Sequence, residues 1–534
     1  MARTQTPKAT DRQTIRIPLI GEPFHRTDDP TGSTTDYIDD TIDQRFENCV
    51  FEKYTNPITD KQVTIVKKRP GFAVNTTYSN SQTATCTSFE LIQPLTGGYA
   101  SLWRSSSNQS TLRLYVGASN SYTANLGSGA TGLSYSSRIQ PCSFNTAASE
   151  CAFLAKGTGV DQKAFYFDGT TVNDITDSDL PVASASGNIV YKNGSLYVLV
   201  YTTGLAKIYN SDLNAPTAWS ATAYIATASA IGSGTIALYK NNIVALCEQG
   251  IEFYEDIGNT TGSPLSHLMP IDIYGYGVSA TVSAQVGPSQ RVLRAFDSLY
   301  WVNNHQLDSG LGIYMLENYK PVKISSGTID KFLATYTTPL QISLAGAGNI
   351  NGHRYLFVWM GASAISNDNK TVFAYDIDLK AWSTWRLGFS AAMNSVLPLT
   401  TAFDAAVANG VLLINEDKDY ACGGDLAQVF VDNSTAYTMT IQTRLIDLDT
   451  EKRKRCHKFA LIGMDARAAS TTSISWSDTD YASFTTARNL DMNNLRTYLT
   501  GLGMFRRRSF RIVNAANTPF EAEAMEIDIS LMGS

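Results

Sequence analysis

The sequence has few charged residues and no long apolar run, and both absences limit the kind of protein that it encodes. Only 17% of the 534 residues are charged, and the formal net charge is −6. This balance argues against a protein whose main task is to grip phosphates. No stretch approaches the roughly 20 apolar residues of a membrane span. The polar start MARTQTPKATDRQ precedes no apolar run typical of a signal peptide. We therefore expect no membrane anchor and a chain that folds in the cytoplasm.

Paired cysteines are absent as well. The seven cysteines are odd in number and include no CxxC pair; they stand at positions 49, 86, 142, 151, 247, 422 and 456. This spacing is typical of reduced, mostly buried thiols, and a disulfide framework is not expected.

Catalytic and cofactor motifs are also missing. The sequence contains no GxxxxGK[ST] loop, no strand followed by GxGxxG, no HExxH, no GxSxG and no Cys/His ligand cluster. The histidines stand far apart, at positions 25, 267, 305, 353 and 457, and we interpret each as a surface or core residue. The sequence thus predicts no catalytic, cofactor-binding or metal-binding residue.

Acidic pairs need weighing, because propeller glycosidases use two carboxylates and Asp-rich turns can bind calcium. The pairs are Asp376 with Asp378, Asp478 with Asp480, and Glu252 with Glu255 and Asp256. Aspartate also closes tight turns, since its side chain accepts hydrogen bonds from nearby backbone amides. We favour turn closure. A virion-associated propeller glycoside hydrolase stays open as an alternative function.

What the sequence does contain is typical of β-structure. From about residue 76 to 435, short aromatic runs alternate with Gly, Asn, Ser and Asp turns. The runs are TLRLYVG (111–117), KAFYFDG (163–169), GSLYVLVYTTG (194–204), GIEFYED (250–256), DSLYWVNN (297–304), HRYLFVWMG (353–361) and TVFAYDIDLKAW (371–382). Residues 353–361 are apolar on both faces, as in a sheet stacked between other sheets.

Two of the segments share a template of strand, Asp or Asn turn, short polar stretch and Trp. They are LAKIYNSDLNAPTAW (205–219) and VFAYDIDLKAW (372–382). Each fits the outer part of a propeller blade, with the Trp packed between neighbouring blades. At roughly 40–50 residues per blade, the region predicts a β-propeller of six to eight blades. Two stacked β-sandwiches would show the same short strands and stay the alternative architecture.

The flanks of this region differ from it. We predict an N-terminal arm over 1–40, N-terminal platform strands over 41–75, the propeller over 76–435 and a C-terminal β platform domain over 436–534. The fold class is therefore all-β, with a propeller inserted into a platform formed by the two terminal segments. Residues 61–67 alternate as a half-buried strand that stops at Arg69-Pro70-Gly71. We expect this strand to pair with the C-terminal segment, 440–530.

Two basic runs lie in the C-terminal segment, EKRKRCHK (451–458) and FRRRSFR (505–511). Neither has the interleaved aromatics and glycines of a platform for stacking bases. A solvated face or salt bridges to a neighbouring subunit are favoured over contact with DNA. The candidate subunit or DNA-channel contacts are Lys452, Arg453, Lys454, Arg455, Arg506, Arg507 and Arg508.

Three blocks of sequence carry a family resemblance. The first is IPLIGEPFHR with DQRFENCVFEKYTNP and KKRPGF, within 17–72; the second is NNIVALCEQGIEFYEDIGNTTGSPL (241–265) with DSLYWVNN and GIYMLENYKPVKISSGTIDKFL (312–333); the third is ISWSDTDYASFTTARNLDM with LGMFRRRSFRIV. In this order they resemble the tail nozzle, or tail-accessory, proteins of short-tailed bacteriophages, also called packaged-DNA stabilisation proteins. The third block departs from the family by placing Tyr481 and Ala482 in a turn that is usually Gly-rich, and Phe484 where Trp is common.

The resemblance implies a structural virion protein and no enzyme. Six copies would form a ring below the portal and adaptor, and the ring would retain packaged DNA and conduct it during ejection, with transient, non-specific contact with double-stranded DNA. A tail needle or tip protein and tail fibres or spikes would lie below. The expected location is the virion tail, after assembly in the host cytoplasm. A receptor-binding tail protein is a further alternative.

Overall fold

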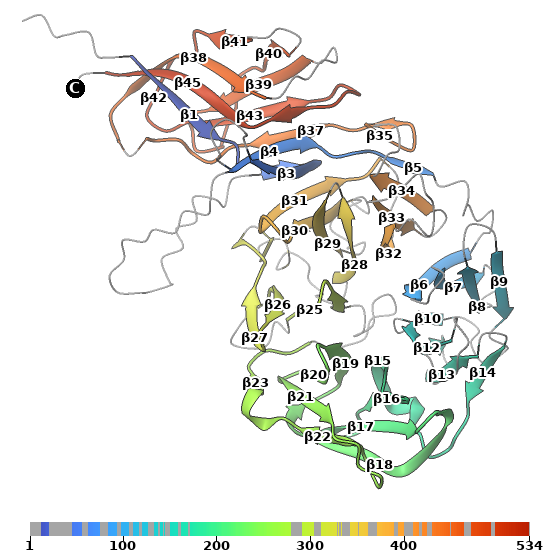
Figure 1. The fold of residues 1–534 in the computed structure, drawn as a ribbon. Helices are drawn as coiled ribbons and strands as arrows, with labels where there is room; N and C mark the ends of the chain where they lie inside the picture. The colour runs from blue at the N-terminus through green and yellow to red at the C-terminus, as the bar shows by residue number, and fades with distance from the viewer. Residues whose placement is uncertain are drawn as a thin grey trace, which may run out of the picture. The chain divides into compact units, whose positions relative to one another are not determined.

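The computed structural model of the chain is built almost entirely from β-strands (Figure 1). The structure describes residues 12–20, 45–55, 62–74, 84–92, 98–105, 110–116, 120–125, 133–136, 139–142, 144, 150–157, 162–168, 171–278, 291–303, 311–327, 329–330, 333, 342–350, 352–360, 371–388, 393–399, 410–415, 419–423, 430–448, 450–463, 471–492 and 497–532. The chain divides into two compact units. The first comprises 1–73, 373–389 and 427–534, and the second comprises 74–372 and 390–426. The first unit is therefore assembled from three separate stretches of sequence.

The second unit is a β-propeller. Its elements are β6 (Ala84–Ile92), β7 (Gly98–Ser105), β8 (Ser110–Val116), β9 (Asn120–Asn125), β10 (Leu133–Ser136), β11 (Gln140–Pro141), β12 (Cys151–Gly157), β13 (Gln162–Phe167), β14 (Val172–Ile175), the 3₁₀ helix η2 (Val182–Ser184), β15 (Ala185–Lys192), β16 (Ser195–Val200), β17 (Leu205–Asp212), β18 (Ala215–Ile231), β19 (Gly234–Tyr239), β20 (Asn242–Cys247), β21 (Gly250–Asp256), β22 (Leu265–His267), the 3₁₀ helix η3 (Met269–Ile271), β23 (Ile273–Tyr274), β24 (Val292–Ala295), β25 (Ser298–Val302), β26 (Ile313–Glu317), β27 (Lys320–Lys323), β28 (Ile342–Ile350), β29 (His353–Met360), β32 (Met393–Leu399), β33 (Gly410–Asn415) and β34 (Asp419–Gly423).

These strands form small antiparallel sheets that follow one another around the unit (Figure 1). Five sheets have a four-strand path: β6-β7-β8-β9, β10-β12-β13-β14, β15-β16-β17-β18, β19-β20-β21-β22 and β24-β25-β26-β27. Two further groups, β28-β29 and β32-β33-β34, meet at one parallel bridge between Gly346 and Val396. In the described part of the unit this makes seven radial groups, within the predicted range of six to eight blades.

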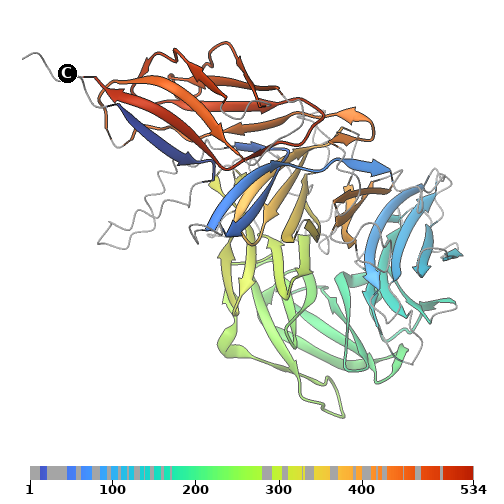
Figure 2. The same cartoon turned by 45° about the horizontal axis from the view of Figure 1, so that its top comes forward.

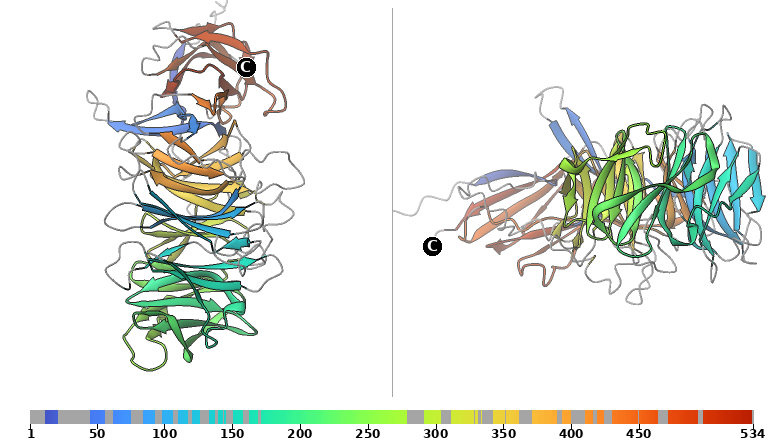
Figure 3. Two further views of the ribbon diagram at one scale, coloured as in Figure 1. Left: turned by 90° about the vertical axis from the view of Figure 1, so that its right-hand side faces the viewer. Right: turned by 90° about the horizontal axis from the view of Figure 1, so that it is seen from below.

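Apolar side chains fill the layers between neighbouring sheets of the unit. Figure 3 shows the strands of these sheets in two further views. Tyr197, Leu199 and Ile208 of one sheet pack in one buried cluster with Ile243 and Tyr254 of the next. Tightly packed layers of this kind hold each blade through its neighbours, since a single four-stranded sheet has no core of its own.

The aromatic runs found in the sequence are strands. The seven runs coincide with β8, β13, β16, β21, β25, β29 and the pair β30–β31 (Thr371–Asp376 and Ala381–Arg386). In β29, every residue from Tyr355 to Trp359 is buried, so the prediction of a strand covered on both faces is confirmed. Trp219 is 5% exposed and packs with Leu154 of one sheet and Val198 of the next. The prediction of a Trp between blades is thus confirmed at this position.

The first unit contains the other strands. They are β1 (Gln13–Pro18), β2 (Arg45–Glu47), β3 (Cys49–Thr55), β4 (Gln62–Lys68), β5 (Phe72–Val74), β30, β31, β35 (Val431–Asp432), β36 (Thr435–Ala436), β37 (Met439–Gln442), β38 (Lys454–Ile462), β39 (Thr471–Ser477), β40 (Arg488–Asp491), β41 (Tyr498–Thr500), β42 (Met504–Phe505), β43 (Ser509–Asn514), β44 (Glu521–Ala522) and β45 (Ala524–Leu531).

Strands from both ends of the chain pair in the same sheets of the first unit, as Figure 2 shows for β1 (dark blue) beside β45 (red). One sheet has the order β1-β45-β38-β41, with β42 also paired to β38; a second includes β40-β39-β43-β37-β2-β31; a third is β3-β4-β44. The prediction that 61–67 pairs with the C-terminal segment is confirmed, because Val66 and Lys67 of β4 pair with Ala522 and Glu521 of β44.

Two details differ from the expectations. Strand β4 is not simply half-buried, because the successive residues Ile65 and Val66 are both buried and its two faces are therefore covered. Within the predicted arm, Gln13–Pro18 is a strand that pairs along its whole length with β45. Ile15 and Ile17 pack against the core of the unit, which gives this stretch enough apolar contact to fold. Residues 21–44 and the polar turn with Asn56 and Pro57 lie outside the described residues.

The remaining predictions concern cysteines and membrane contact. The six cysteines that the structure describes are free and buried, as expected for reduced core thiols. Among the described residues, no helix has the length and apolar character needed to cross a membrane.

Candidate functional site

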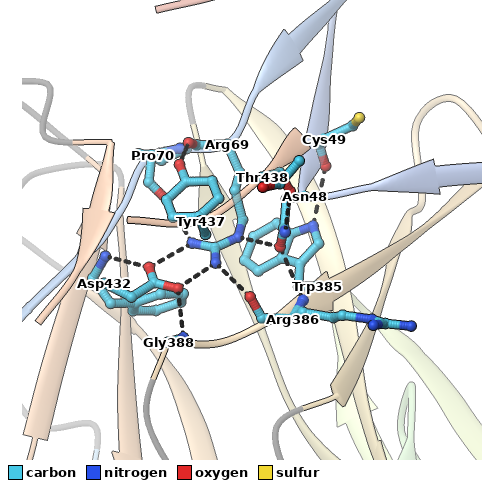
Figure 4. A network of polar contacts seen from close by, with 11 residues as sticks. Asn48, Cys49, Arg69, Pro70, Trp385, Arg386, Gly388, Asp432, Tyr437 and Thr438 are labelled. Atoms are coloured by element: carbon cyan, nitrogen blue, oxygen red, sulfur yellow. Dashed lines mark hydrogen bonds and ion pairs between the residues drawn. The ribbon is translucent and has the colours of Figure 1, made fainter. Parts of the chain in front are cut away.

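The motif Arg69-Pro70-Gly71-Phe72, at the end of β4, leads into a fully buried ion pair of the first unit. The Arg69 guanidinium binds both carboxylate oxygens of Asp432, with Nη1 2.8 Å from Oδ1 and Nη2 2.5 Å from Oδ2. Both side chains have zero exposure. Two parallel charge-assisted hydrogen bonds are the strong form of an arginine–carboxylate pair. We call this pair and its surroundings the arginine node (Figure 4).

Every N–H group of the Arg69 guanidinium has an acceptor. Besides the two bonds to Asp432, Nε donates to Oδ1 of Asn48 at 3.0 Å, Nη1 to the carbonyl oxygen of Pro70 at 3.0 Å, and Nη2 to that of Arg386 at 3.1 Å. A guanidinium has five N–H donors, so all of them are used. This saturation is what makes burial of the charge tolerable.

The Asp432 carboxylate is equally well supplied with donors. The backbone N–H of Phe72 donates to Oδ1 at 3.1 Å and that of Gly388 to Oδ2 at 2.9 Å. A Cβ atom at position 388 would lie 2.9 Å from Cβ of Asp432, closer than side-chain carbons approach. Glycine is therefore the residue that lets this backbone come near the carboxylate.

Aromatic rings enclose the guanidinium of Arg69. Its central carbon lies 4.0 Å from the centroid of the Tyr437 ring, 5.4 Å from that of Phe72 and 5.5 Å from that of Trp385. Cation–π attraction is strongest where water is excluded. The Trp385 indole N–H donates to the carbonyl oxygen of Cys49 at 3.0 Å, so this ring also has a fixed position.

Asn48 ties the node to the backbone around it. Its φ of 56° lies in the left-handed region that Asn tolerates better than most residues. Its Nδ2 donates to the carbonyl oxygen of Thr438 at 2.7 Å, and its Oδ1 accepts from the backbone N–H of Arg386 at 2.9 Å. The node thus joins the three sequence stretches of the first unit, around residues 48–72, 385–388 and 432–438.

Lys68, next to the node, is also buried. Its Nζ donates to the carbonyl oxygen of Ala516 at 2.7 Å. Burial, and secondarily the charge of Arg69, lower the pKa of Lys68 to about 8. Two cations therefore lie close together in the interior, and each is bound by acceptors within the unit.

The sequence indicated only that the chain stops sharply at 69–71. The structural partners of Arg69 were missed, because Asp432 is separated from it by 363 positions and no local pattern marks such a contact. A basic residue directly after a buried strand and before Pro-Gly was the one available signal.

The two basic runs of the C-terminal segment, by contrast, were identified separately and are brought together by the fold. Lys454 pairs with Phe505 and Arg455 with Met504 across β38 and β42. Nζ of Lys454 donates to the carbonyl oxygens of Thr450 at 2.5 Å and Arg506 at 2.8 Å. Lys454 therefore fastens the first basic run to the second.

Two of the seven predicted contact residues lie in the interior. Lys454 is fully buried and Arg508 is 1% exposed. Burial lowers the pKa of Lys454, against the opposing charges of Asp447 and Glu451. Arg508 binds Asp478 through Nε and Nη2, both at 2.7 Å. The structure thus gives these two residues a structural role in place of the predicted contact, because their charged ends are already bound within the unit.

The other five predicted contact residues are exposed, and we call them the cationic cluster: Lys452, Arg453, Arg455, Arg506 and Arg507. Arg507 makes a surface ion pair with Asp480 at 2.7 Å. Within the described part of the chain, the first four have no ion-pair partner. Their role as subunit or DNA contacts stays a prediction.

The acidic pairs have mostly structural partners. Oδ1 of Asp376 accepts from the backbone N–H groups of Asp378 at 3.0 Å and Leu379 at 2.9 Å, so turn closure is confirmed there. Asp478 and Asp480 bind arginines of the second basic run, as described above.

The members of the third acidic group lie on opposite faces of their strand. On β21, Glu252 is buried and Glu255 is exposed, so the two carboxylates do not face one cleft. Asp256 closes a turn, since its Oδ1 accepts from the backbone N–H of Gly258 at 2.9 Å. Glu252 has two other acid–base neighbours, to which we return below.

Comparison with solved structures finds matches of low sequence identity. YCF48 bound to a D1 peptide is 9% identical, with a TM-score of 0.36, and the match covers 67% of this chain and 97% of that one. The WD40 β-propeller domain of Doa1 is 10% identical, with a TM-score of 0.33 and coverages of 67% and 96%. BamB from Moraxella catarrhalis is 10% identical, with a TM-score of 0.35 and coverages of 66% and 99%. These values add nothing to what the sheet order already shows.

Two further comparisons bear on identity. No curated protein matches the chain. A family model described as "Bacteriophage P22 Gp10, beta-propeller" matches residues 115–393, which is more than half of the chain and lies over the radial sheets. The chain therefore belongs to this family of phage β-propeller proteins, and it is a phage structural protein.

Proposed function

We propose that the protein is the tail nozzle subunit of a short-tailed phage, a ring-forming component that retains packaged DNA and conducts it during ejection. The observation that carries the proposal is the membership of a phage propeller family. The three sequence blocks that resemble tail nozzle proteins support the finer assignment. In this role the portal-adaptor ring lies above the subunit, and a needle or tip protein with fibres or spikes lies below.

The first unit supports a role in assembly. It is built from both ends of the chain and one internal stretch, and the arginine node fastens these stretches together in the interior. Four exposed cations of the cationic cluster have no ion-pair partner among the described residues, so their charges are open to an acidic surface of another subunit. Exposed charges of this kind steer association and fix its register.

The proposal is tested by the oligomeric state of the purified chain. Native mass spectrometry and electron microscopy are applied to the chain alone and after mixing with the adaptor protein encoded by the same phage. The expected result is a ring with six-fold symmetry and an axial hole, alone or on the adaptor. The number six comes from the resemblance, so a closed ring of another size would correct the number and keep the role.

The role itself has a clear counter-result. If the chain stays monomeric over the whole concentration range in which the adaptor forms rings, and does not bind the adaptor ring, it is not a nozzle. A control at 0.01 M salt separates weak electrostatic assembly from none, since the reach of surface charges lengthens there to about 30 Å.

A further inference from the structure

Three side chains of the kinds that bind metal ions lie close together in the second unit. The sequence did not identify them as a group. They are Glu252 on β21, His267 on β22 and Asp272 directly after η3. His267 Nε2 lies 3.6 Å from Oε2 of Glu252 and 3.0 Å from Oδ2 of Asp272. The three donor atoms all lie within 4.8 Å of one another. The imidazole nitrogen is thus flanked by two carboxylates.

These side chains are largely withdrawn from water. The exposed fraction is 1% for Glu252, 3% for Asp272 and 14% for His267. Burial, and then the charge of Glu252, raise the pKa of Asp272 against the opposing effect of His267. Two buried carboxylates beside one imidazole carry a net charge of −1 even when the imidazole is protonated. A divalent cation with a neutral imidazole would bring the charge to zero.

The first carboxylate and the imidazole are held in place by neighbours. The Tyr254 hydroxyl donates to Oε2 of Glu252 at 2.6 Å, and the backbone N–H of Ala228 donates to the same oxygen at 3.0 Å. The Tyr254 ring stacks on the His267 ring, with centroids 5.1 Å apart and planes inclined by 25°. Outer contacts that orient both a carboxylate and an imidazole are typical of built metal sites.

We propose that Glu252, His267 and Asp272 form a site for a divalent transition-metal ion of the zinc type. Zinc binds histidine nitrogen at about 2.0–2.1 Å and carboxylate oxygen at about 2.0–2.2 Å. Tetrahedral ligands at these lengths stand about 3.4 Å apart. The two separations from His267, 3.0 and 3.6 Å, differ from this value by a few tenths of an ångström, and the two carboxylates, within 4.8 Å of each other, would close around the ion. The metal replaces the proton on Nε2 of His267, so one proton is released when the imidazole binds protonated.

The donor set selects the class of metal. Calcium and magnesium prefer all-oxygen sites with six or more ligands, whereas one imidazole with two carboxylates suits zinc, cobalt or manganese. The fourth position would be a water molecule on the side where His267 is partly exposed. The ion would clamp β22, a strand of three residues, and η3 to the longer strand β21. The site is independent of the nozzle proposal, since it concerns the stability of one blade.

The test uses the full-length chain without an affinity tag, after dialysis against a chelator. Zn²⁺ binding is then measured by isothermal titration calorimetry, and the number of bound metal ions per chain is measured by elemental mass spectrometry. The expected result is one ion per chain and a thermal midpoint that rises with Zn²⁺ concentration. Co²⁺ is then bound in place of Zn²⁺, and its visible spectrum should show no sulfur-to-cobalt charge-transfer band, which separates the site from the cysteines.

Three variants locate the binding. His267→Gln and Asp272→Asn should each weaken the affinity by about 100-fold or more, because each removes a direct ligand, a larger loss than that of an outer-shell contact. Glu255→Gln is the matched control: it lies on the same strand as Glu252, removes the same charge and is exposed, and it should bind as the unchanged chain does.

Several outcomes overturn the proposal. Absence of stoichiometric Zn²⁺, Co²⁺ or Mn²⁺ binding by the folded unchanged chain would mean that His267 only connects the two carboxylates by polar contacts, and this result needs no variant to fold. Binding that survives in both ligand variants, or a charge-transfer band from thiolate, would place the metal elsewhere. If a variant unfolds, as circular dichroism would reveal, X-ray absorption of the unchanged chain still decides whether the ion is bound by nitrogen and oxygen alone.

Discussion

The arginine node and the cationic cluster belong to the same unit and use the same residue types, yet they are opposite in environment. In the node, Arg69 and Asp432 have zero exposure and every polar atom of the guanidinium is bonded. In the cluster, Arg507 and Asp480 are 46% and 53% exposed, and four further cations have no ion-pair partner among the described residues. The sequences KKRPGF and FRRRSFR look alike. Position in the fold, more than composition, separates a residue that holds the platform from one that is available to a partner.

The largest expected effect comes from opening the node. Arg69→Met should lower the free energy of unfolding by about 3–5 kcal/mol, because it leaves the Asp432 carboxylate buried without its cation. Arg69→Lys should recover little of this loss, since an ammonium cannot make the two parallel bonds of a guanidinium. Urea unfolding followed by circular dichroism measures both.

A double variant shows whether the loss arises from the unpaired charge. Arg69→Met combined with Asp432→Leu removes both charges, so its cost should be smaller than the sum of the two single costs by about 1–3 kcal/mol. If the two single losses of unfolding free energy simply add up in the double variant, Arg69 and Asp432 are no more coupled than distant residues. The node would then not differ from the cationic cluster in interaction energy.

The second prediction concerns Lys68, which has a folded pKa of about 8 against about 10.4 in an unfolded chain. Between these values the unfolded chain binds more protons at this residue, so its contribution to stability rises with pH. The cost of burying charged Lys68 is fully present below pH 8 and is lost as the pH rises toward 10. The unchanged chain should therefore gain on the order of 2 kcal/mol relative to Lys68→Met over this range.

Using the difference between the two proteins cancels the titration of buried Cys and Tyr residues, which acts in the opposite direction in both. Urea midpoints at pH 7.5 and pH 10 provide the measurement. A difference that stays constant or falls with pH would show that Lys68 keeps its proton in the interior, and that the node tolerates a second cation without strain.

These residues also show how far the sequence could predict the fold. Strands were predictable because alternation and aromatic runs are local, and TLRLYVG and HRYLFVWMG both fall on strands, β8 and β29. The pairing of β4 with the C-terminal segment was also predicted, through the inference that both termini form one platform. Register was not predictable: Val66 faces Ala522 across 456 positions, and no local rule selects that partner.

The candidate site was predicted less well than the fold. Runs of basic residues are visible in a sequence, but their burial is not, so Lys454 and Arg508 were grouped with exposed neighbours. The burial depends on Phe505, whose ring lies 4.4 Å from the Arg508 guanidinium, and on Asp478, which is 30 positions away. The sequence predicted each histidine to be a surface or core residue, and it gave no sign of the two carboxylates beside His267, because Glu252 and Asp272 come from separate elements.

The third prediction tests a case between the two extremes. Arg508 is 1% exposed while its partner Asp478 is 35% exposed. Arg508→Met leaves a carboxylate that water can reach, and it also removes the bond from Nη1 to the carbonyl oxygen of Leu502 at 2.8 Å. We expect a loss of about 1.5–3 kcal/mol, the usual contribution of a hydrogen bond to a charged group. A loss as large as that of Arg69→Met would mean that solvent access to the partner carboxylate does not moderate the cost.

The smallest effect on stability is expected for the cationic cluster, so its role must be tested by assembly and binding as well as by unfolding. Replacing Lys452, Arg453, Arg455 and Arg506 one at a time with Gln should alter the free energy of unfolding by less than about 0.5 kcal/mol each, because exposed charges in water contribute little. The combined variant should instead weaken ring formation or adaptor binding, with a loss that shrinks as salt rises from 50 mM to 500 mM, since screening already removes the attraction there.

The matched control is Arg294→Gln with Lys320→Gln, two exposed cations of the second unit, which should leave assembly unchanged. If the combined variant assembles normally but loses salt-dependent binding to double-stranded DNA, the cluster faces the nucleic acid. If it unfolds, these cations are structural, and the distinction drawn between the node and the cluster is wrong.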